Sequence, residues 1–269
     1  ILDELIESYC SLDNICPLRE LVNPKTVKRC DYPSIMHIAW KRNAKTQEKG
    51  NIIKKTGNGF LCHSKMTGNK IIIPISAMLN GLWALSGLAT LDITDKEDRI
   101  ITRSFSDYEN YFDRDVRLIF KQWGMKKLQN YLSDLFVPRK IDFGASGTAH
   151  LAVRTEKPLV PSTSIWGLGN LGEKGKFLVL FMHSTLGIAL LFRRRIEVRG
   201  SWSQFSKETI LALPVPDFNS LDKNSKKKLM RVYDTVKDMS FPSLVEQFST
   251  SFDGLMEIDK TIFSVLGLE

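Results

Sequence analysis

The sequence predicts an α+β (mixed α/β) fold, in which short strands and helices form one domain and a helical hairpin follows it. Short apolar segments bounded by Gly, Asn or Pro, such as 70–75, are typical of strands. Longer segments with apolar residues three and four positions apart, such as 106–136, are typical of amphipathic helices. Because both kinds of segment occur along the chain, a domain that mixes helices with short sheets is favoured over an all-helical or all-strand fold.

The first part of the chain is predicted to begin with a helix and to continue mainly as strands. Residues 1–12 form the helix, since Leu2, Leu5, Ile6 and Tyr9 would share one face of it. Strands or strand-like turns are expected at 18–22, 34–40, 60–62 and 70–75, and a helix or strand-turn element at 76–91. Tight turns that contain Gly and Asn separate several of these elements.

The segment 106–136 has strong helical spacing. Its apolar residues at that spacing are Val116, Ile119, Phe120, Trp123, Leu128, Tyr131, Leu132 and Leu135. Gly124 splits or kinks the helical segment, and Pro138 lies just beyond it. After it, strands are expected near 151–153 and 164–168, whereas 138–141 is not expected to form a buried strand.

An apolar stretch from Phe177 to Phe192 is predicted to be a buried helix at the centre of the domain. The polar insert at 183–185 interrupts it. A membrane span needs about 20 apolar residues, so this stretch is too short and too interrupted to be one. Three arginines follow at 193–195, and the helix dipole favours cations at a helix C-terminus. They form either a solvated helix end or an edge that contacts phosphates, with Trp202 near it as an anchor.

Two further amphipathic segments follow Asp217. They lie at 220–239 and 243–266, and Pro242 separates them. We therefore expect a mixed α/β domain at 1–218 and a C-terminal helical spacer or docking segment at 219–269.

The composition is that of a basic globular protein. The chain has 269 residues, of which 43% are hydrophobic, enough for a real core. Its formal net charge of +8 fits a nucleic-acid partner, although many basic proteins bind none. The four cysteines form no CxxC pair, so reduced thiols in a cytoplasmic protein are expected. The N-terminal segment is too acidic for a signal peptide, and the start at Ile1 suggests a fragment of something longer.

No motif of a complete catalytic site is present in this sequence, and whether the chain is an enzyme is left open. An amino-methyltransferase needs a Pro-Pro-aromatic turn for the flipped base, and the 10 prolines include no adjacent pair. A common restriction nuclease site needs a lysine two positions after an acidic residue, and none of the 30 Asp and Glu residues has one. The residue pattern of the glycine-rich segment 142–147 is similar to that of a cofactor-binding loop, but a turn near DNA or a structural turn is the preferred interpretation.

The segment MHSTLGIALLF at 182–192 resembles the NSTLG helix of large bacterial and archaeal adenine-N6 DNA methyltransferases of the restriction–modification and phage-defence type. As in that family, a basic stretch, a Gly-x-Trp turn at 200–202 and an exit at 213–217 follow the helix. The segments 143–154 and 159–168 are similar to two further segments of the family. This chain has His183 where the family usually has Asn.

The resemblance implies that the chain is the C-terminal target-recognition (specificity) region of such an enzyme. Its partners would be double-stranded DNA and a catalytic methyltransferase domain or subunit, and no membrane is expected. S-adenosylmethionine would bind that catalytic domain, so this chain is expected to hold no cofactor and no metal. The alternative is a protein-interaction module of a phage-defence complex, in which the helical tail and the basic edge bind an acidic protein. A degenerate or novel enzyme is a third possibility.

Two groups of residues are candidates for DNA contacts. Lysine and arginine neutralise phosphates, whereas polar side chains on loops read base edges. The candidates for phosphate contacts are Arg139, Lys140, Arg193, Arg194, Arg195 and Arg199. The candidates for contacts with or near the bases are Ser146, Thr148, His150 and Arg154, for which an ordinary polar loop is the other interpretation.

Overall fold

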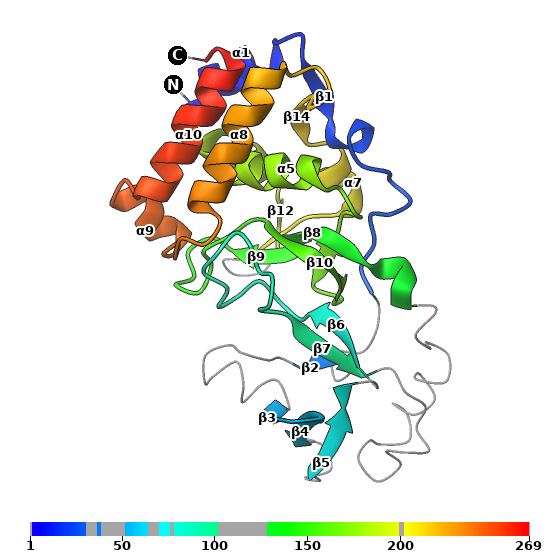
Figure 1. Ribbon diagram of the computed structural model, residues 1–269. Coiled ribbons are helices and arrows are strands. Elements are labelled where there is room, and N and C mark those ends of the chain that lie inside the picture. The colour runs from blue at the N-terminus through cyan, green and yellow to red at the C-terminus, as the bar shows by residue number, and fades with distance from the viewer. Residues whose placement is uncertain are drawn as a thin grey trace.

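The structure is a computed structural model that describes residues 2–30, 37–38, 52–63, 70–75, 78–101, 128–198 and 202–268. Helices and strands both make up large parts of the described chain, which confirms the predicted α+β class. The helices gather at one end, a mixed sheet occupies the middle, and a small sheet lies at the other end (Figure 1).

The elements have the following bounds. The helices are α1 (Leu2–Cys10), α5 (Glu173–His183), α6 (Thr185–Arg193), α7 (Lys207–Leu211), α8 (Lys223–Val236), α9 (Leu244–Ser249) and α10 (Asp253–Leu266), with 3₁₀ turns η1 (Leu18–Glu20) and η5 (Gln129–Tyr131). The strands of the first half are β1 (Ile15–Pro17), β2 (His37–Ile38), β3 (Ile52–Thr56), β4 (Gly59–His63), β5 (Lys70–Pro74), β6 (Met78–Leu82) and β7 (Asp98–Ile101). Those of the second half are β8 (Ser133–Pro138), β9 (Lys140–Asp142), β10 (Val153–Pro161), β11 (Ile165–Gly167), β12 (Ile196–Glu197), β13 (Trp202–Gln204) and β14 (Pro214–Pro216).

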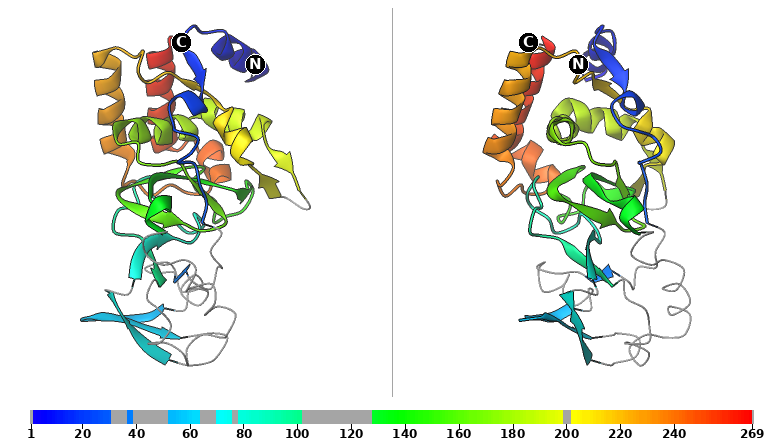
Figure 2. Two further views of the ribbon diagram at one scale, coloured as in Figure 1. Left: turned by 90° about the vertical axis from the view of Figure 1, so that its right-hand side faces the viewer. Right: turned by 45° about the vertical axis from the view of Figure 1, so that its right-hand side comes forward.

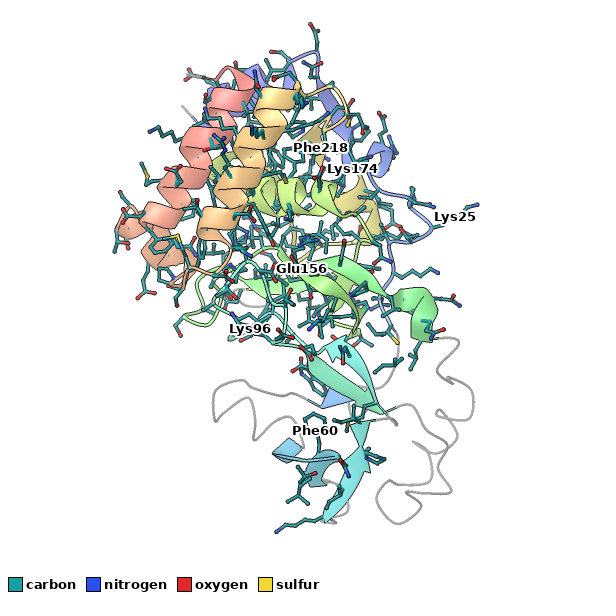
Figure 3. All side chains as sticks on the ribbon, in the orientation of Figure 1. Lys25, Phe60, Lys96, Glu156, Lys174 and Phe218 are labelled. Carbon is teal, nitrogen blue, oxygen red and sulfur yellow. The ribbon has the colours of Figure 1, made fainter. Side chains whose placement is uncertain are left out.

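The largest sheet has the strand order β11-β8-β10-β6-β7-β2. Its neighbouring strands are antiparallel except β10 and β6, which run parallel. The smaller sheets are β12-β13-β9, β3-β4-β5 and the pair β1-β14. The sheet β3-β4-β5 buries Phe60 and Ile73, far from the helical end of the molecule (Figure 3).

The helix predicted to run to residue 136 is wrong at its C-terminal end, where the chain forms strand β8. Every residue of β8 is buried. Because β11 and β10 flank this strand and its two faces are covered, its residues 135–137 are apolar on both faces. Spacing alone does not distinguish such a strand from a buried helix. Residues 102–127, which make up most of the predicted helix, lie outside the described residues.

One hydrophobic core joins α5 to the helices around it. Phe177 and Phe181 of α5 are buried together with Tyr9 of α1 and Leu229 of α8. Helices α8 and α10 lie side by side and both contact α5 (Figure 1). The second arm of the predicted hairpin is split into α9 and α10, and Ser251 between them has a left-handed φ of 50°. The tail thus shares the main core, and the division of the chain at residue 218 stays a prediction.

Helices α5 and α6 meet at Ser184 with a bend of 77°, at the predicted polar insert. Ser184 Oγ donates a hydrogen bond to the Phe181 carbonyl at 2.7 Å and accepts one from Gly187 N at 3.1 Å. It therefore ends one helix and caps the next. Asp259 of α10 accepts a hydrogen bond from Thr185 N at 2.7 Å, which ties the start of α6 to the tail. In the described part of the chain, no single helix is long and apolar enough to cross a membrane.

We expect Gly187→Ala to destabilise the fold, because a Cβ at this position would lie 1.9 Å from the Phe181 carbonyl oxygen. Rotating a side chain does not relieve a clash with backbone, so the free energy of unfolding should fall by about 3 kcal/mol or more. Urea denaturation followed by circular dichroism measures this change. Gly57→Ala is the control, since no atom lies within 4 Å of a Cβ there. Equal stability of the two variants would contradict the prediction.

Candidate nucleic-acid interface

Strands β9 and β13 form a ribbon that presents one polar and aromatic face. Trp202 lies opposite Asp142, and Gln204 lies opposite Lys140. Directly opposed residues of paired strands share a face, so these four side chains lie on the same side of the ribbon. Ile141 on the other face is only 5% exposed. The expectation that 138–141 contains no buried strand is therefore wrong in part, because Lys140, Ile141 and Asp142 alternate between exposed and buried positions.

The hairpin of β12 and β13 projects from the body of the molecule (Figure 2). Its strand β12 pairs with β13, which in turn pairs with β9. The chain thus offers a projecting element next to the basic candidates of the sequence analysis.

The loop at 143–150 is attached at both ends to distant helices. The Phe143 ring lies edge-on to the ring of Phe192, with 5.1 Å between centroids, and Phe192 directly precedes the three arginines. Near the other end of the loop, the Thr148 carbonyl accepts a hydrogen bond from Leu244 N at the start of α9, at 2.8 Å. These contacts place the predicted base-contacting loop beside the C-terminal end of α6.

A cavity of about 400 Å³ lies between the ribbon and this loop. Lys140, Asp142 and Trp202 line it from the ribbon, whereas Thr148 and His150 line it from the loop. The apolar part of its wall includes Leu85, Pro138, Ile141 and Ile165. Trp202 is 49% exposed, so much of its ring is open to solvent. The fold therefore gathers three of the predicted DNA-contact residues, Lys140, Thr148 and His150, around one cavity.

His150 forms a buried pair with His183 of α5. His150 Nδ1 and His183 Nε2 are 2.8 Å apart, and the two side chains are 2% and 0% exposed. One ring must donate and the other accept, so the accepting imidazole is neutral. Burial lowers the pKa of both rings, which keeps the donating imidazole neutral as well near pH 7. No third His, Cys, Asp or Glu joins the pair in a metal site within the described residues. His150 is thus in the interior and not on an open polar loop, which corrects that expectation.

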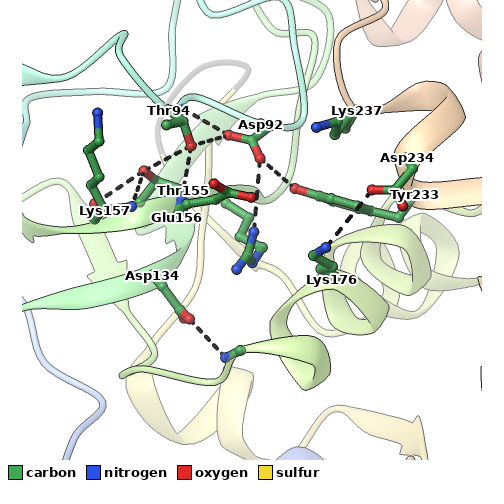
Figure 4. Close-up of polar contacts among 12 residues, drawn as sticks. Asp92, Thr94, Asp134, Thr155, Glu156, Lys157, Lys176, Tyr233, Asp234 and Lys237 are labelled. Carbon is green, nitrogen blue, oxygen red and sulfur yellow. Dashed lines mark hydrogen bonds and ion pairs between the residues drawn. The ribbon is translucent and has the colours of Figure 1, made fainter. Parts of the chain in front are cut away.

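Arg154, predicted to lie near the bases, is also inside the fold. Its Nη1 lies 3.9 Å from Asp92 Oδ2, and the residue is 6% exposed. Asp92 also accepts hydrogen bonds from Tyr233 Oη at 2.9 Å and from Thr94 N at 2.8 Å (Figure 4). Burial raises the pKa of Tyr233, so this hydroxyl keeps its proton and remains a donor. Arg154 therefore lies in a buried polar cluster and not on an accessible loop, which corrects that expectation.

The remaining candidates for DNA contacts differ in how exposed their side chains are and in whether their charges are paired. Arg193 and Arg194 are exposed at the C-terminus of α6 and line a second hollow that α1 also borders. Arg195 instead stacks on the Phe192 ring and pairs with Glu197 at 2.5 Å. Lys140 and Ser146 are exposed, Arg139 and Thr148 are half-buried, and Arg199 lies outside the described residues. The DNA contacts of all these residues stay predictions.

Two parts of the site were missed from the sequence. Ala84, Leu85 and Ser86 form part of the cavity wall, yet they belong to a segment that carried no functional signal. Asp92, which anchors the buried cluster, lies at the start of a charged stretch and gave no sign of burial. In both cases the neighbouring residues are remote in the sequence and come close only when the chain folds.

Comparisons with known proteins add little information about the function of this chain. No family model and no curated protein matches the chain. Among solved structures, the chain is similar to the type IIG restriction endonuclease BpuSI, with a TM-score of 0.49 and 12% sequence identity. The match covers 99% of this chain and 33% of that chain, so this chain spans about a third of that neighbour's length. A likeness this weak carries no argument about function.

The histidine pair predicts a loss of stability on acidification. Burial lowers the pKa of His150 well below its ordinary value and the pKa of His183 to about 4. Between pH 6.5 and the folded-state values the unfolded chain binds more protons, so stability falls as the pH falls through this window. Each histidine contributes a slope of about 1.4 kcal/mol per pH unit. Burial raises the pKa values of Asp134 and Asp259, and these two groups act in the opposite direction.

Urea denaturation of the wild type and of His183→Asn at several pH values from 7.5 down to about 4.5 tests this, since the carboxylates cancel in the comparison. We expect the variant to show a slope shallower by about 1.4 kcal/mol per pH unit. Identical slopes for the two proteins would show that His183 does not stay neutral in the fold.

We expect the substitution Arg154→Ala to lower the stability of the fold. The substitution leaves the Asp92 carboxylate buried without its cation, and breaking a buried pair costs about 3 kcal/mol or more. The exposed Lys140→Ala should change stability by only about 0.5 kcal/mol or less. Thermal melting of both variants distinguishes the two roles. If the Arg154→Ala protein has the same melting temperature as the wild type, the buried cluster does not have the structural role assigned to it.

Proposed function

We propose that this chain binds double-stranded DNA as the target-recognition part of an adenine-N6 DNA methyltransferase or restriction–modification enzyme. Catalysis and S-adenosylmethionine binding would then belong to a separate domain or subunit. The observation that supports this most is the packing of Phe143 on Phe192. This contact joins the two segments that carry both the family resemblance and the candidate DNA contacts, at 143–154 and 182–195.

The cations best placed for phosphates are Arg193, Arg194 and Lys140, since all three are exposed. None of them forms an ion pair with another described residue. Phosphate contacts release counterions, so the binding constant should fall steeply with salt. Arg195 contributes less, because its charge is offset by Glu197.

Base reading would fall to the loop and the ribbon. Ser146 is exposed, and hydroxyl side chains can pair with several base edges in the major groove. The projecting hairpin of β12 and β13 would bring the ribbon to the groove while the arginines hold the backbone (Figure 2). The cations would then fix the register of the protein on the DNA, and a few polar side chains would recognise the DNA sequence.

The alternative is a protein-interaction module, and one observation favours it. Val245 and Phe248 on α9 and Met256 on α10 are 55%, 46% and 53% exposed. Exposed apolar side chains that gather on a surface mark interaction sites in many proteins. Binding of an acidic protein would also weaken with salt, but it would not require duplex DNA.

We expect the chain to bind labelled duplex DNA with an affinity that falls with salt, and the double variant Arg193→Ala/Arg194→Ala to have a shallower slope. Each lost phosphate contact lowers the log–log slope by about 0.9, so the pair should lower it by about 1.8. Fluorescence anisotropy at several salt concentrations measures the slope.

The matched control is Lys223→Ala/Lys227→Ala, which removes the same charge from exposed positions on α8. We expect its slope to equal that of the wild type. A wild-type slope near zero, or no binding at low salt, would remove the proposed function. If both double variants lowered the slope equally, only net charge would matter and the arginines would have no specific role.

A further inference from the structure

We propose that the cavity between the β9–β13 ribbon and the 143–150 loop receives an unstacked nucleobase of the bound DNA, with Trp202 as its stacking platform. The inference rests on the proposed DNA binding and adds a site to it. It concerns a pocket in this chain and is separate from any pocket in a catalytic domain.

The size and the walls of the cavity fit a flat ring system. Its volume of about 400 Å³ lies at the small end of the ~300–1,000 Å³ that small-molecule sites occupy. Apolar side chains, among them Leu85, Pro138 and Ile165, make up part of the wall, which suits a ring better than a charged group. A base that remained paired inside a duplex could not enter, so the occupant must be extrahelical.

Trp202 is positioned to stack. Strand pairing with β9 fixes its backbone opposite Asp142, and its ring is 49% exposed although it lines the cavity. Stacking of a base on an aromatic side chain contributes ~1–3 kcal/mol. Taking a base out of the helix costs about a few kcal/mol, least for a base that has no partner. A platform of this kind therefore favours bases that are already unpaired or easily flipped.

The polar groups of the cavity suit a nucleotide better than an apolar ligand. Lys140 Nζ and Thr148 Oγ1 form no hydrogen bond within the described part of the chain. A base edge can pair with the Thr148 hydroxyl, and its phosphate with the Lys140 ammonium group. An acyl chain would contact the apolar wall but pair with neither of these two groups.

The test uses a short labelled duplex in three forms: fully paired, with one extra nucleotide in one strand, and with the same extra nucleotide lacking its base. The form without a base controls for the bend and the flexibility of the bulge. In the wild type we expect the duplex with an extra base to bind about tenfold more tightly than the baseless one, as stacking of that size implies.

Trp202→Ala should abolish this preference, whereas Trp202→Phe should keep most of it. Ala145→Phe, which adds a ring at the cavity wall, should also abolish it while leaving Trp202 in place. Phe248→Ala is the matched control, because it removes an exposed aromatic side chain that does not line the cavity. Circular dichroism confirms that each variant is folded.

The outcomes separate this inference from the proposed function. If all three duplexes bind equally and with a steep salt dependence, the chain binds DNA and the base pocket is overturned. If no duplex binds, both proposals are overturned. If a free deoxynucleoside monophosphate competes at micromolar concentration while an extra base in the duplex has no effect, the occupant is a free nucleotide and the inference is again overturned.

Discussion

The hydrogen bonds at Ser184 decide where the basic end of the molecule lies. Ser184 is fully buried, and it both ends α5 and caps α6. Without that interruption, the apolar run would continue as one straight helix and carry its arginines elsewhere. Gly187 lets the two helices approach closely, and Asp259 ties the joint to α10 through Thr185. One polar joint in an apolar core therefore sets the direction of α6 relative to both the sheet and the tail.

The bend has consequences at the surface. It brings Phe192, at the end of α6, against Phe143 and so places the arginines beside the loop that follows β9. The same loop is held by Leu244 of α9, which connects the cavity wall to the tail helices. The cavity is lined by β9 and the loop that follows it, by Trp202 of β13 and by residues 84–86, so it exists only when these remote segments of the chain are packed together. Loss of the bend between α5 and α6 would therefore displace residues of the candidate interface as well as disrupt the core.

The sequence predicted those elements whose one face is buried and whose other face is solvated. Helix α8 is an example: Leu229, Val232 and Tyr233 are buried while its lysines stay outside. Strand β8 was missed because both of its faces are covered, which removes the alternation that identifies a strand. The cavity could not be predicted, since the register of β13 on β9 and the wall at 84–86 depend on pairings remote in the sequence. Arg154 and His150 were read as accessible because their partners, Asp92 and His183, are likewise remote.

The buried residues change what the net charge of +8 means for binding. Arg154 is offset by Asp92 inside the fold, and Arg195 by Glu197 at the surface, so neither adds much to the outward field. The surface that remains for a polyanion is narrower than the arginine count suggests, with Lys140 on the ribbon and Arg193 and Arg194 at the helix end. Few phosphate contacts give a modest, salt-sensitive affinity and little discrimination between sequences. Selectivity would therefore have to come from contacts with bases, and the described cavity with Trp202 at its rim is the feature of this surface best shaped to supply one.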